Sequence, residues 1–313
     1  MYIPEEEVRS LLTYDALLPA IREALIDYSA DKEKEEGEQS KVVQPPRTIL
    51  RPGAHDWFAV MPVIHGDVMA VKSVTFFPGN ASRNADPSLP THMAVITLFR
   101  RATGQPLAVM DGRLITEMRT AAVSAVALHA LASPEVKSLG ILGAGVQARS
   151  HLETLRRVRP SFTDVRIWSR TPARAEELAA ETGAKAAAIE EAASADVVLT
   201  ATASPTPVLE GRWLSPKAVI LAVGAVGAHL RELDDEAARS SWIVAESRAS
   251  IERESGDILL SGAPVQAEIG QLLANPAYPV PRNRHILFKS VGMAIEDLVA
   301  ARLVWQVHAS RQA

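Results

Sequence analysis

The sequence predicts an α/β protein that combines a doubly wound parallel sheet with an α+β part built on antiparallel strands. Short apolar strands alternate with helices between residues 139 and 246, which is typical of right-handed βαβ units. Short β-branched and aromatic segments separated by turns fill residues 44–110, as in an antiparallel meander. The length of 313 residues is enough for two domains of ordinary size.

The composition excludes several classes of protein. The net charge is −4, with 47% apolar and 22% charged residues, so a nucleic-acid partner is not expected. The chain has no cysteine, which excludes disulfides, thiolate nucleophiles and cysteine-based metal sites. Its eight histidines are scattered, without an HxH or HExxH pair, and no metal site is predicted.

The N-terminal residues MYIPEEEVRS are acidic and lack an apolar core, unlike a signal peptide. No apolar run approaches the roughly 20 residues that a membrane helix needs. We therefore expect a cytoplasmic protein without a membrane partner, in keeping with the absence of cysteine.

The elements outside the βαβ region follow from periodicity. Helices are predicted over residues 4–30, followed by a solvated charged run at 31–40 that ends a helix and continues as a loop. Three strand segments lie between residues 57 and 101, with turns at His65-Gly66-Asp67, Pro78-Gly79-Asn80 and 102–106. An alanine-rich helix is predicted over residues 115–131, with Thr116 as its N-cap.

The βαβ region is predicted to contain strands at 139–142, 165–168, 196–202, 218–224 and 242–246, with helices at 146–158 and 172–181. Pro172 would be the first helical residue behind Thr171 as cap. A last helix is predicted from Ser290 to about residue 308. Ser290 at its start is either a helix cap or a contact to a cofactor.

The segment Gly143-Ala144-Gly145-Val146-Gln147-Ala148 follows an apolar strand and opens a helix. In a dinucleotide-binding turn of the Rossmann type, the first glycine permits the tight turn and the second lets the backbone approach the pyrophosphate. A small third residue packs helix on strand, and the helix N-terminus supplies N–H groups. The motif alone is a weak signal, but its strand–turn–helix context favours a dinucleotide over a bend without ligand.

The second strand of this region ends at Trp168-Ser169-Arg170-Thr171. A site that prefers NAD places a carboxylate there for the ribose 2′-hydroxyl, whereas an arginine flanked by hydroxyls suits a 2′-phosphate. NADP(H) is therefore favoured over NAD(H). The alternative is that Arg170 is a solvated surface residue.

Three cations lie where stability alone would not place them. Arg119 is expected in the first turn of the helix that begins near Thr116, where a cation opposes the helix dipole. It either receives an anion beside Thr120 or pairs with Glu117 or another acid. Lys72 shares a strand face with apolar residues, so it needs an anionic partner or has a lowered pKa; the alternative is a lysine that protects an edge strand.

Arg47 follows two prolines, which hold the backbone extended, and could grip a carboxylate or lie on the surface. His92 and Asp111 are equally ambiguous.

Together these segments resemble the ornithine cyclodeaminase and mu-crystallin family, and within it most closely the mu-crystallin-like ketimine reductases. The matching segments are VMP (60–62), AVK (70–72), AVMDG (108–112), IT (115–116), RTAAVS (119–124), ILGAGVQA (141–148), VRIW (165–168), RELDD (231–235), ESGD (254–257) and FKSVGMA (288–294). They extend over residues 45–300 and are far more specific than any one motif.

The resemblance implies a Rossmann domain at 116–289 inserted into a substrate-binding and dimerisation domain formed by 1–115 with 290–313. Two subunits would meet through their antiparallel strands. The implied substrate-binding residues are Arg47, Lys72, Arg119 and Glu254, with Lys72 also catalytic. The expected cofactor-binding residues are Thr91, His92, Arg119, Thr120, Gly143, Gly145, Val146, Gln147, Ser169, Arg170, Thr171, Thr202, Val223 and Ser290.

One departure separates subfamilies. The cyclodeaminases and related alanine dehydrogenases carry an aspartate after the strand that here ends at Val223-Gly224-Ala225, whereas this chain has Val226. Valine can neither take up a proton nor pair with the substrate amine. The resemblance therefore implies NADPH-dependent reduction of a small cyclic ketimine carboxylate by a homodimer, and an anionic imine or amino acid as substrate.

Three alternatives remain open. The first is an ornithine cyclodeaminase or an NAD(P)-dependent amino-acid dehydrogenase, and the second is an opine-type dehydrogenase. The third, from a different class, is a non-catalytic protein that binds a small ligand together with NADPH.

Overall fold

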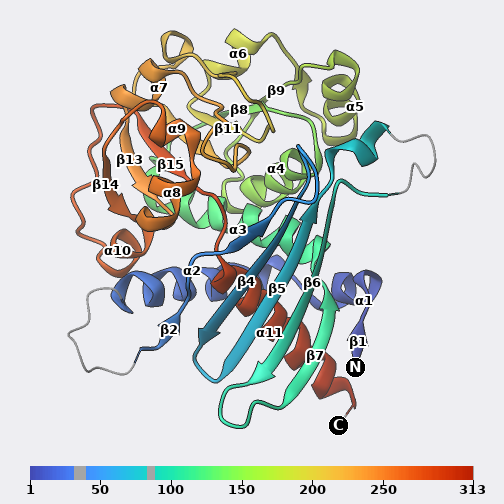
Figure 1. Cartoon of the computed structure of the whole chain (residues 1–313). Helices are drawn as coiled ribbons and strands as arrows, with labels where there is room; N and C mark the ends of the chain where they lie inside the picture. Colours follow the sequence, from blue (N-terminus) through green and yellow to red (C-terminus); the bar gives the residue numbers. More distant parts are fainter. Residues whose placement is uncertain (32–39, 83–88, 313) are drawn as a thin grey trace. The chain divides into compact units, whose positions relative to one another are not determined.

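The computed structural model describes residues 1–31, 40–82 and 89–312. The chain forms two compact units, the first of Met1–Arg119 with Met293–Ala313 and the second of Thr120–Gly292. The second unit is thus an insertion in the first. The chain passes from one unit to the other inside α3 (Arg113–Leu131) and returns just before α11 (Ala294–Gln312); both helices are labelled in Figure 1.

The first unit contains β1 (Tyr2–Ile3), α1 (Glu5–Leu11), α2 (Tyr14–Asp31), β2 (Val42–Val43), β3 (Thr48–Leu50), β4 (Trp57–His65), β5 (Val68–Phe76), the 3₁₀ helix η1 (Pro78–Ser82), β6 (His92–Arg100), β7 (Pro106–Asp111), the start of α3, and α11. Its seven-stranded sheet has the order β1-β7-β6-β5-β4-β2, with β3 also paired to β4. The predicted antiparallel meander is confirmed for β4 to β7, while β1 adds a parallel edge.

Strand alternation explains which face of this sheet is covered. Helix α11 packs against β4, β5 and β6, and the residues that face it include Ala70, Lys72 and Val74, all buried. The opposite face keeps apolar side chains exposed, among them Met93 and Val95 on β6 at 37% and 42%. The sheet therefore has one buried face and one partly uncovered apolar face.

The second unit contains the rest of α3, β8 (Ser138–Leu142), α4 (Val146–Val158), β9 (Asp164–Trp168), α5 (Pro172–Thr182), β10 (Lys185–Ala186), α6 (Ile189–Ala193), β11 (Val197–Thr200), the 3₁₀ helix η2 (Gly211–Trp213), β12 (Val219–Ala222), α7 (Asp235–Ser240), β13 (Trp242–Ala245), α8 (Arg248–Glu254), α9 (Gly256–Leu259), β14 (Val265–Glu268), α10 (Ile269–Ala274) and β15 (Ile286–Lys289).

All neighbouring strands of the second unit run parallel, in the order β10-β9-β8-β11-β12-β15-β13-β14. The order reverses between β8 and β11. In a doubly wound sheet, ligands bind beside the carboxyl ends of the strands at such a reversal. The predicted fold class is therefore correct, and the phosphate turn at the end of β8 lies at the reversal.

The last quarter of the second unit differs from the sequence-based prediction. Strands β14 and β15 were not predicted, and the last helix begins at Ala294 rather than at Ser290. Ser290 follows β15, whose four residues are all buried in the sheet. The short apolar run before Ser290 resembles the start of a buried helix, and periodicity cannot separate the two. Ser290 is therefore not a helix cap.

The start of α3 is also earlier than predicted. The helix begins at Arg113, whose backbone N–H is accepted by the Asp111 carboxylate at 2.9 Å. Thr116 lies inside the first turn, and its hydroxyl donates to the Gly112 carbonyl at 2.6 Å. Thr116 is thus not the N-cap, and Arg119 lies in the second turn. The argument from the helix dipole at Arg119 does not apply.

Two further expectations concern helix α3 and the charged run that follows α2. Helix α3 is long and apolar enough to span a membrane by length and composition alone, with 72% of its 18-residue window buried within the protein, so the expectation that no run approaches that length is wrong. It is the one such helix among the described residues, and its burial matches a core helix. The charged run begins where α2 ends at Asp31, and residues 32–39 lie outside the described residues.

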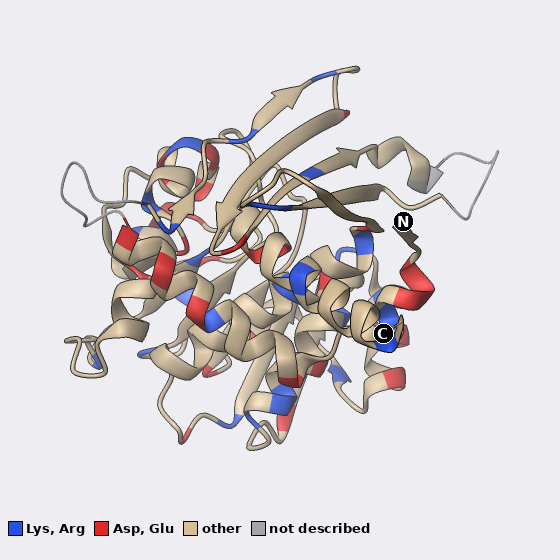
Figure 2. Cartoon of the chain, turned by 90° about the horizontal axis from the view of Figure 1, so that it is seen from below, with Lys and Arg blue, Asp and Glu red and all other residues tan. Residues whose placement is uncertain are grey.

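Basic and acidic side chains are interspersed along the helices (Figure 2). Many form pairs one helical turn apart, such as Arg9 with Glu5 and Arg239 with Asp235. This mixed pattern agrees with the small net charge of the sequence and differs from the single-sign stripe that marks a polyanion-binding surface.

Candidate active site

The phosphate turn, residues 143–148, connects β8 to α4. Gly143 has a φ of +129° and its N–H donates to the Trp168 carbonyl at 2.8 Å. A Cβ added at Gly143 would lie 2.5 Å from the Ala201 carbonyl oxygen. Both the backbone angle and the close approach of the next strand therefore require glycine at this position.

Gly145 has a different role. It is the N-cap of α4, no side chain caps the helix there, and a Cβ added to Gly145 would meet nothing within 4 Å. The first N–H groups of α4 are thus left for a ligand, and the backbone is open to close approach. Ala148 is fully buried against the sheet, and the buried Oε1 atom of Gln147 has no hydrogen-bond partner among the described residues. The open N-terminus of α4 and the lack of a side chain at Gly145 fit a dinucleotide pyrophosphate.

Ser169, Arg170 and Thr171 follow β9 at the same edge of the sheet. Thr171 is the N-cap of α5 with Pro172 behind it, as predicted, although its side chain makes no capping hydrogen bond. Instead, the Thr171 N–H donates to the Ser169 hydroxyl at 3.3 Å. Arg170 is exposed, so it is accessible to a 2′-phosphate and equally compatible with a surface role.

The loops after β11 and β12 are held together by Glu232, which the sequence analysis did not identify. Its carboxylate accepts hydrogen bonds from the Thr200 hydroxyl at 2.8 Å and from the Thr202 N–H and hydroxyl at 2.6 and 2.7 Å. It also accepts from the Gly224 N–H at 2.8 Å. Thr202 and Val223 are thus brought to one place, but the Thr202 hydroxyl is already used.

The buried ion pair of Asp257 and Lys289 holds the backbone of Glu232 in place. The Asp257 carboxylate accepts from the backbone N–H of Glu232 at 2.7 Å and lies 2.8 Å from the Lys289 ammonium. Lys289 also donates to the Ala225 carbonyl at 3.2 Å. Burial raises the pKa of Glu232, Lys289 opposes this shift and Asp257 adds to it. The network fixes the loop that contains Val226.

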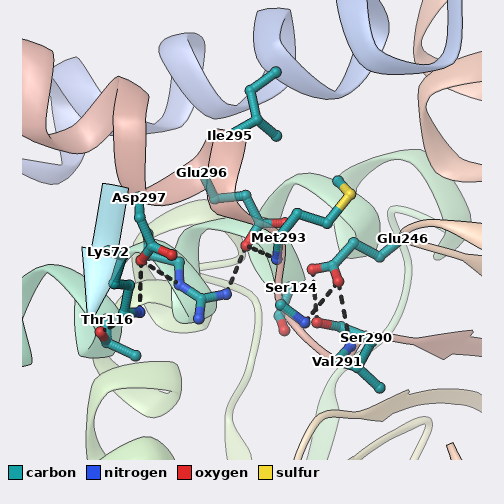
Figure 3. A network of polar contacts seen from close by, with 12 residues as sticks. Lys72, Thr116, Ser124, Glu246, Ser290, Val291, Met293, Ile295, Glu296 and Asp297 are labelled. Carbon is teal, nitrogen blue, oxygen red and sulfur yellow. Dashed lines mark hydrogen bonds and ion pairs between the residues drawn. The ribbon is translucent and has the colours of Figure 1, made fainter. Parts of the chain in front are cut away.

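Ser290 and Glu254 lie at two further loops of the second unit. The Ser290 hydroxyl donates to Glu246 at 2.7 Å, and the same carboxylate accepts from the Gly292 N–H at 2.7 Å (Figure 3). The Glu254 carboxylate accepts from Arg253 at 2.5 Å, while its backbone carbonyl accepts from the Gly227 N–H at 2.8 Å. Glu254 is therefore next to the loop of Val226.

The most polar part of the first unit is the Lys72 cluster, which we define as Lys72, Thr116, Arg119, Glu296 and Asp297 (Figure 3). Lys72 is central in the sheet and 2% exposed, so the edge-strand interpretation is wrong. Its ammonium donates to Asp297 at 2.9 Å. Arg119 is 2.6 Å from Glu296 and 3.2 Å from Asp297. Both acids belong to α11, which confirms the alternative that Arg119 pairs with an acid.

Hydrogen bonding fixes the direction of the Lys72 ammonium. The Thr116 hydroxyl donates to the Gly112 carbonyl, so it must accept from Lys72, which lies 2.7 Å away. An ammonium has three N–H groups, and Asp297 and Thr116 use two of them. The third has no partner among the described residues and is available to a ligand. Burial lowers the pKa of Lys72 to about 8, with Asp297 opposing the shift and Arg119 and Arg47 adding to it.

Two other residues expected at the site lie near this cluster. Arg47, half-buried before β3, is close enough to influence the Lys72 pKa. His92 begins β6, and its ring lies 4.5 Å from that of Phe76 and 6.0 Å from that of Trp57. His92 is exposed to solvent, and desolvation together with the Lys72 charge lowers its pKa, so the ring is neutral at pH 7.

The remaining residues expected at the cofactor are Thr91 and Thr120. The Thr91 carbonyl accepts from the Phe77 N–H at 2.8 Å, and Thr120 is buried on α3. Neither position contradicts a cofactor role or provides direct support for one. Asp111, which was ambiguous in sequence, caps α3 through Arg113.

The comparisons with known proteins agree with this geometry. A model of the ornithine cyclodeaminase/mu-crystallin family matches residues 1–312. The chain is 42% identical over 314 residues to ketimine reductase mu-crystallin of Rattus norvegicus, covering 97% of this chain and 96% of that protein.

Two solved structures are similar over the whole chain. One is the Δ1-pyrroline-2-carboxylate reductase of Thermococcus litoralis in complex with NADH and L-proline, with a TM-score of 0.90 and 31% identity over 100% of this chain and 98% of the other. The second is an archaeal alanine dehydrogenase dimer with bound NAD, with a TM-score of 0.91 and 28% identity over 100% and 97%. The chain therefore belongs to the ornithine cyclodeaminase/mu-crystallin family.

Proposed function

We propose that this protein is an NAD(P)H-dependent oxidoreductase that reduces the C=N bond of a small cyclic ketimine carboxylate to give the cyclic imino acid. The observation that carries the proposal is the Lys72 cluster. In this cluster the buried Lys72 ammonium has one available N–H and lies near Arg119 and Arg47. The cluster is on the face of the first sheet that α11 covers. The similarity to a ketimine reductase and to a Δ1-pyrroline-2-carboxylate reductase supports it.

The charged side chains of the Lys72 cluster and of Arg47 suit a substrate with one carboxylate. Lys72, Arg119 and Arg47 are three cations, and Glu296 and Asp297 are two anions. Cations brought together in this way favour an anionic ligand. Arg47 and Arg119 have the planar guanidinium groups that bind carboxylates at two points.

The proton for the imine nitrogen is assigned to Lys72. A protonated imine is the better hydride acceptor, and a donor works best when its pKa is near the working pH, as is the lowered pKa of Lys72. The cofactor, held at the phosphate turn of the second unit, supplies the hydride. His92, neutral at pH 7, adds no further charge.

Val226 distinguishes this chemistry from deamination. It lies in the loop after β12, half-buried against the apolar core of the second unit. A valine there cannot hold a substrate amine or accept its proton. We propose Glu254 as a substrate-binding residue because its backbone carbonyl accepts from the Gly227 N–H, beside the same loop.

We further propose that NADP(H) is preferred over NAD(H). Arg170 is exposed at the end of β9, and no carboxylate lies in Ser169-Arg170-Thr171 to bind a ribose 2′-hydroxyl. The named structural relatives contain NADH and NAD, so the preference depends on this loop. The other cofactor residues proposed are those of the phosphate turn, together with Thr91, His92, Arg119, Thr120, Thr202, Val223 and Ser290.

A homodimer is proposed through the uncovered face of the first sheet. Met93, Val95 and Leu50 expose apolar side chains there, and exposed apolar surface marks interfaces. The archaeal relative is a dimer. A charged side chain in place of Val95 should shift the protein towards monomer in light scattering. An unchanged mass would mean that this face is not the interface.

The test of the proposed function is NADPH oxidation with cyclic ketimine carboxylates of five- and six-membered rings, compared with the same rings lacking the carboxylate. We expect oxidation with the carboxylates and at least a tenfold loss in kcat/KM without them, since a charged hydrogen bond contributes about 1.5–3 kcal/mol. Equal rates for both series would refute the assigned role of the cations. No oxidation of any ketimine by protein that binds NADPH would favour the non-catalytic alternative.

A further inference from the structure

Helix α11 brings two carboxylates into the interior of the first unit. Glu296 is 0% and Asp297 1% exposed. Burying a carboxylate is costly unless a cation and hydrogen bonds compensate. Such a pair is retained more readily where its partners have a function, and here the partners are Lys72 and Arg119.

Glu296 and Asp297 contact different partners. Glu296 contacts the Nη1 atom of Arg119 at 2.6 Å and accepts from the Met293 N–H at 3.3 Å. Asp297 accepts from Lys72 at 2.9 Å and also lies 3.2 Å from the Nε atom of Arg119. Asp297 alone bridges the lysine and the arginine, as the dashed lines in Figure 3 show.

We propose that Asp297 is a positioning residue that keeps Lys72 protonated and points its remaining N–H at the substrate, so that Lys72 can act as the proton donor. Thr116 completes the arrangement by accepting the second N–H. Asp297 itself does not touch the substrate. This inference rests on the proposed reduction of a ketimine and adds the residue that prepares its acid.

The electrostatic surroundings of Lys72 support this role. The charged groups that influence it are Asp297 on α11, Arg119 on α3 and Arg47 before β3, while His92 on β6 is uncharged at pH 7. Burial and the two arginines lower the Lys72 pKa, and Asp297 is the group that raises it. Without the Asp297 charge, burial and the two arginines would favour loss of the Lys72 proton.

The test compares Asp297→Asn with Glu296→Gln and Asp297→Glu. Asp297→Asn keeps the size and one acceptor but removes the charge. It should move the alkaline limb of the kcat/KM profile for ketimine reduction down by about 1–3 pH units, the usual effect of an adjacent opposite charge. Glu296→Gln, matched in helix, turn and burial, should raise KM through Arg119 and leave the limb in place. Asp297→Glu should restore the limb.

A second readout is independent of activity. In protein labelled with ¹³C at lysine Cε, the resonance absent from Lys72→Met reports the Lys72 pKa directly. We expect a Lys72 that is protonated at pH 7 in the wild type and a lower pKa in Asp297→Asn. A wild-type pKa below 7 would overturn the proposal even if the variants failed to fold. So would an unmoved alkaline limb in a folded Asp297→Asn.

These results also separate the two proposals. If the wild type reduces no ketimine, the proposed function fails, and the lysine titration still decides whether Asp297 controls Lys72. Suppose instead that the wild type reduces ketimines, but Asp297→Asn changes neither the alkaline limb of kcat/KM nor the Lys72 pKa. Then only the proposed role of Asp297 fails.

Discussion

The phosphate turn takes all its groups from six consecutive residues, whereas the Lys72 cluster gathers residues 72, 116, 119, 296 and 297 from three separate elements. In the first case, glycine spacing and a helix N-terminus create the site locally. In the second, Lys72 and Arg119 are each held by an acid of α11 that is far away in sequence. A change at Gly145 should therefore affect cofactor binding with little effect on stability, and a change at Lys72 should affect chemistry with little effect on cofactor binding.

The largest effect is expected for Lys72→Met. Loss of a positioned proton donor usually costs a factor of about 10²–10⁴ in rate, and we expect kcat/KM for ketimine reduction to fall by this amount. The NADPH dissociation constant, measured by fluorescence, should stay within a few fold of the wild type. Lys185→Met, at a side chain that is 77% exposed, is the control. Near-normal activity of Lys72→Met would remove Lys72 from the chemistry.

The two glycines of the turn should respond in opposite ways. Gly145→Val meets open space within the protein, so the free energy of unfolding should change little while NADPH binding weakens about 10- to 100-fold through lost phosphate contacts. Gly143→Val requires a valine at φ +129° and should lower the free energy of unfolding by about 1–3 kcal/mol. Denaturant titration and cofactor titration of both variants check this. Full NADPH affinity in Gly145→Val would place the pyrophosphate elsewhere.

The pH dependence of kcat/KM for ketimine reduction should differ from the pH dependence of NADPH binding. Lys72 must be protonated to act as an acid, and its pKa is about 8. The kcat/KM for ketimine reduction should therefore be level below this value and fall about tenfold for each pH unit above it. NADPH binding, which does not depend on Lys72, should not follow the same curve. A rate that continues to rise above pH 9 would contradict Lys72 as the donor.

The smallest effect is expected for Arg170→Ala. Because Arg170 is exposed, solvent screens its charge, and NADPH binding should weaken about tenfold or less. NADH binding should be nearly unchanged, since NADH has no 2′-phosphate. Titrating both cofactors against wild type and variant measures the difference. Equal losses would show that Arg170 does not contact the 2′-phosphate and would leave cofactor preference unexplained.

The contrast between the two regions also explains how far sequence reasoning could go. The phosphate turn, β8, α4 and the parallel sheet were predictable because periodicity and glycine spacing are local signals. Lys72 was recognisable as a misplaced cation, and Arg119 was singled out from a helix start that the structure places earlier. Their partners Asp297 and Glu296 are more than 170 residues away. A possible signal was the pair of acids inside the apolar run of 291–301, because charges in such a run need buried partners.

Other errors have local physical causes. The start of α3 was placed late because Asp111 caps it from the end of a strand, and Thr116 looked like the cap by residue type alone. Strand β15 was missed because four buried apolar residues carry no alternation. Glu232 could not be identified because its role depends on backbone N–H groups of two loops that meet only in the folded sheet.

The most direct test of the proposed function is a pair of assays on the same preparation. In one, the protein receives NADPH and Δ1-pyrroline-2-carboxylate, and oxidation of the cofactor is followed. In the other, it receives L-ornithine with NAD⁺, and ammonia is measured. We predict rapid cofactor oxidation with the ketimine and no ammonia from ornithine, because Val226 provides no group for the substrate amine. Ammonia release without ketimine reduction would contradict the proposed function.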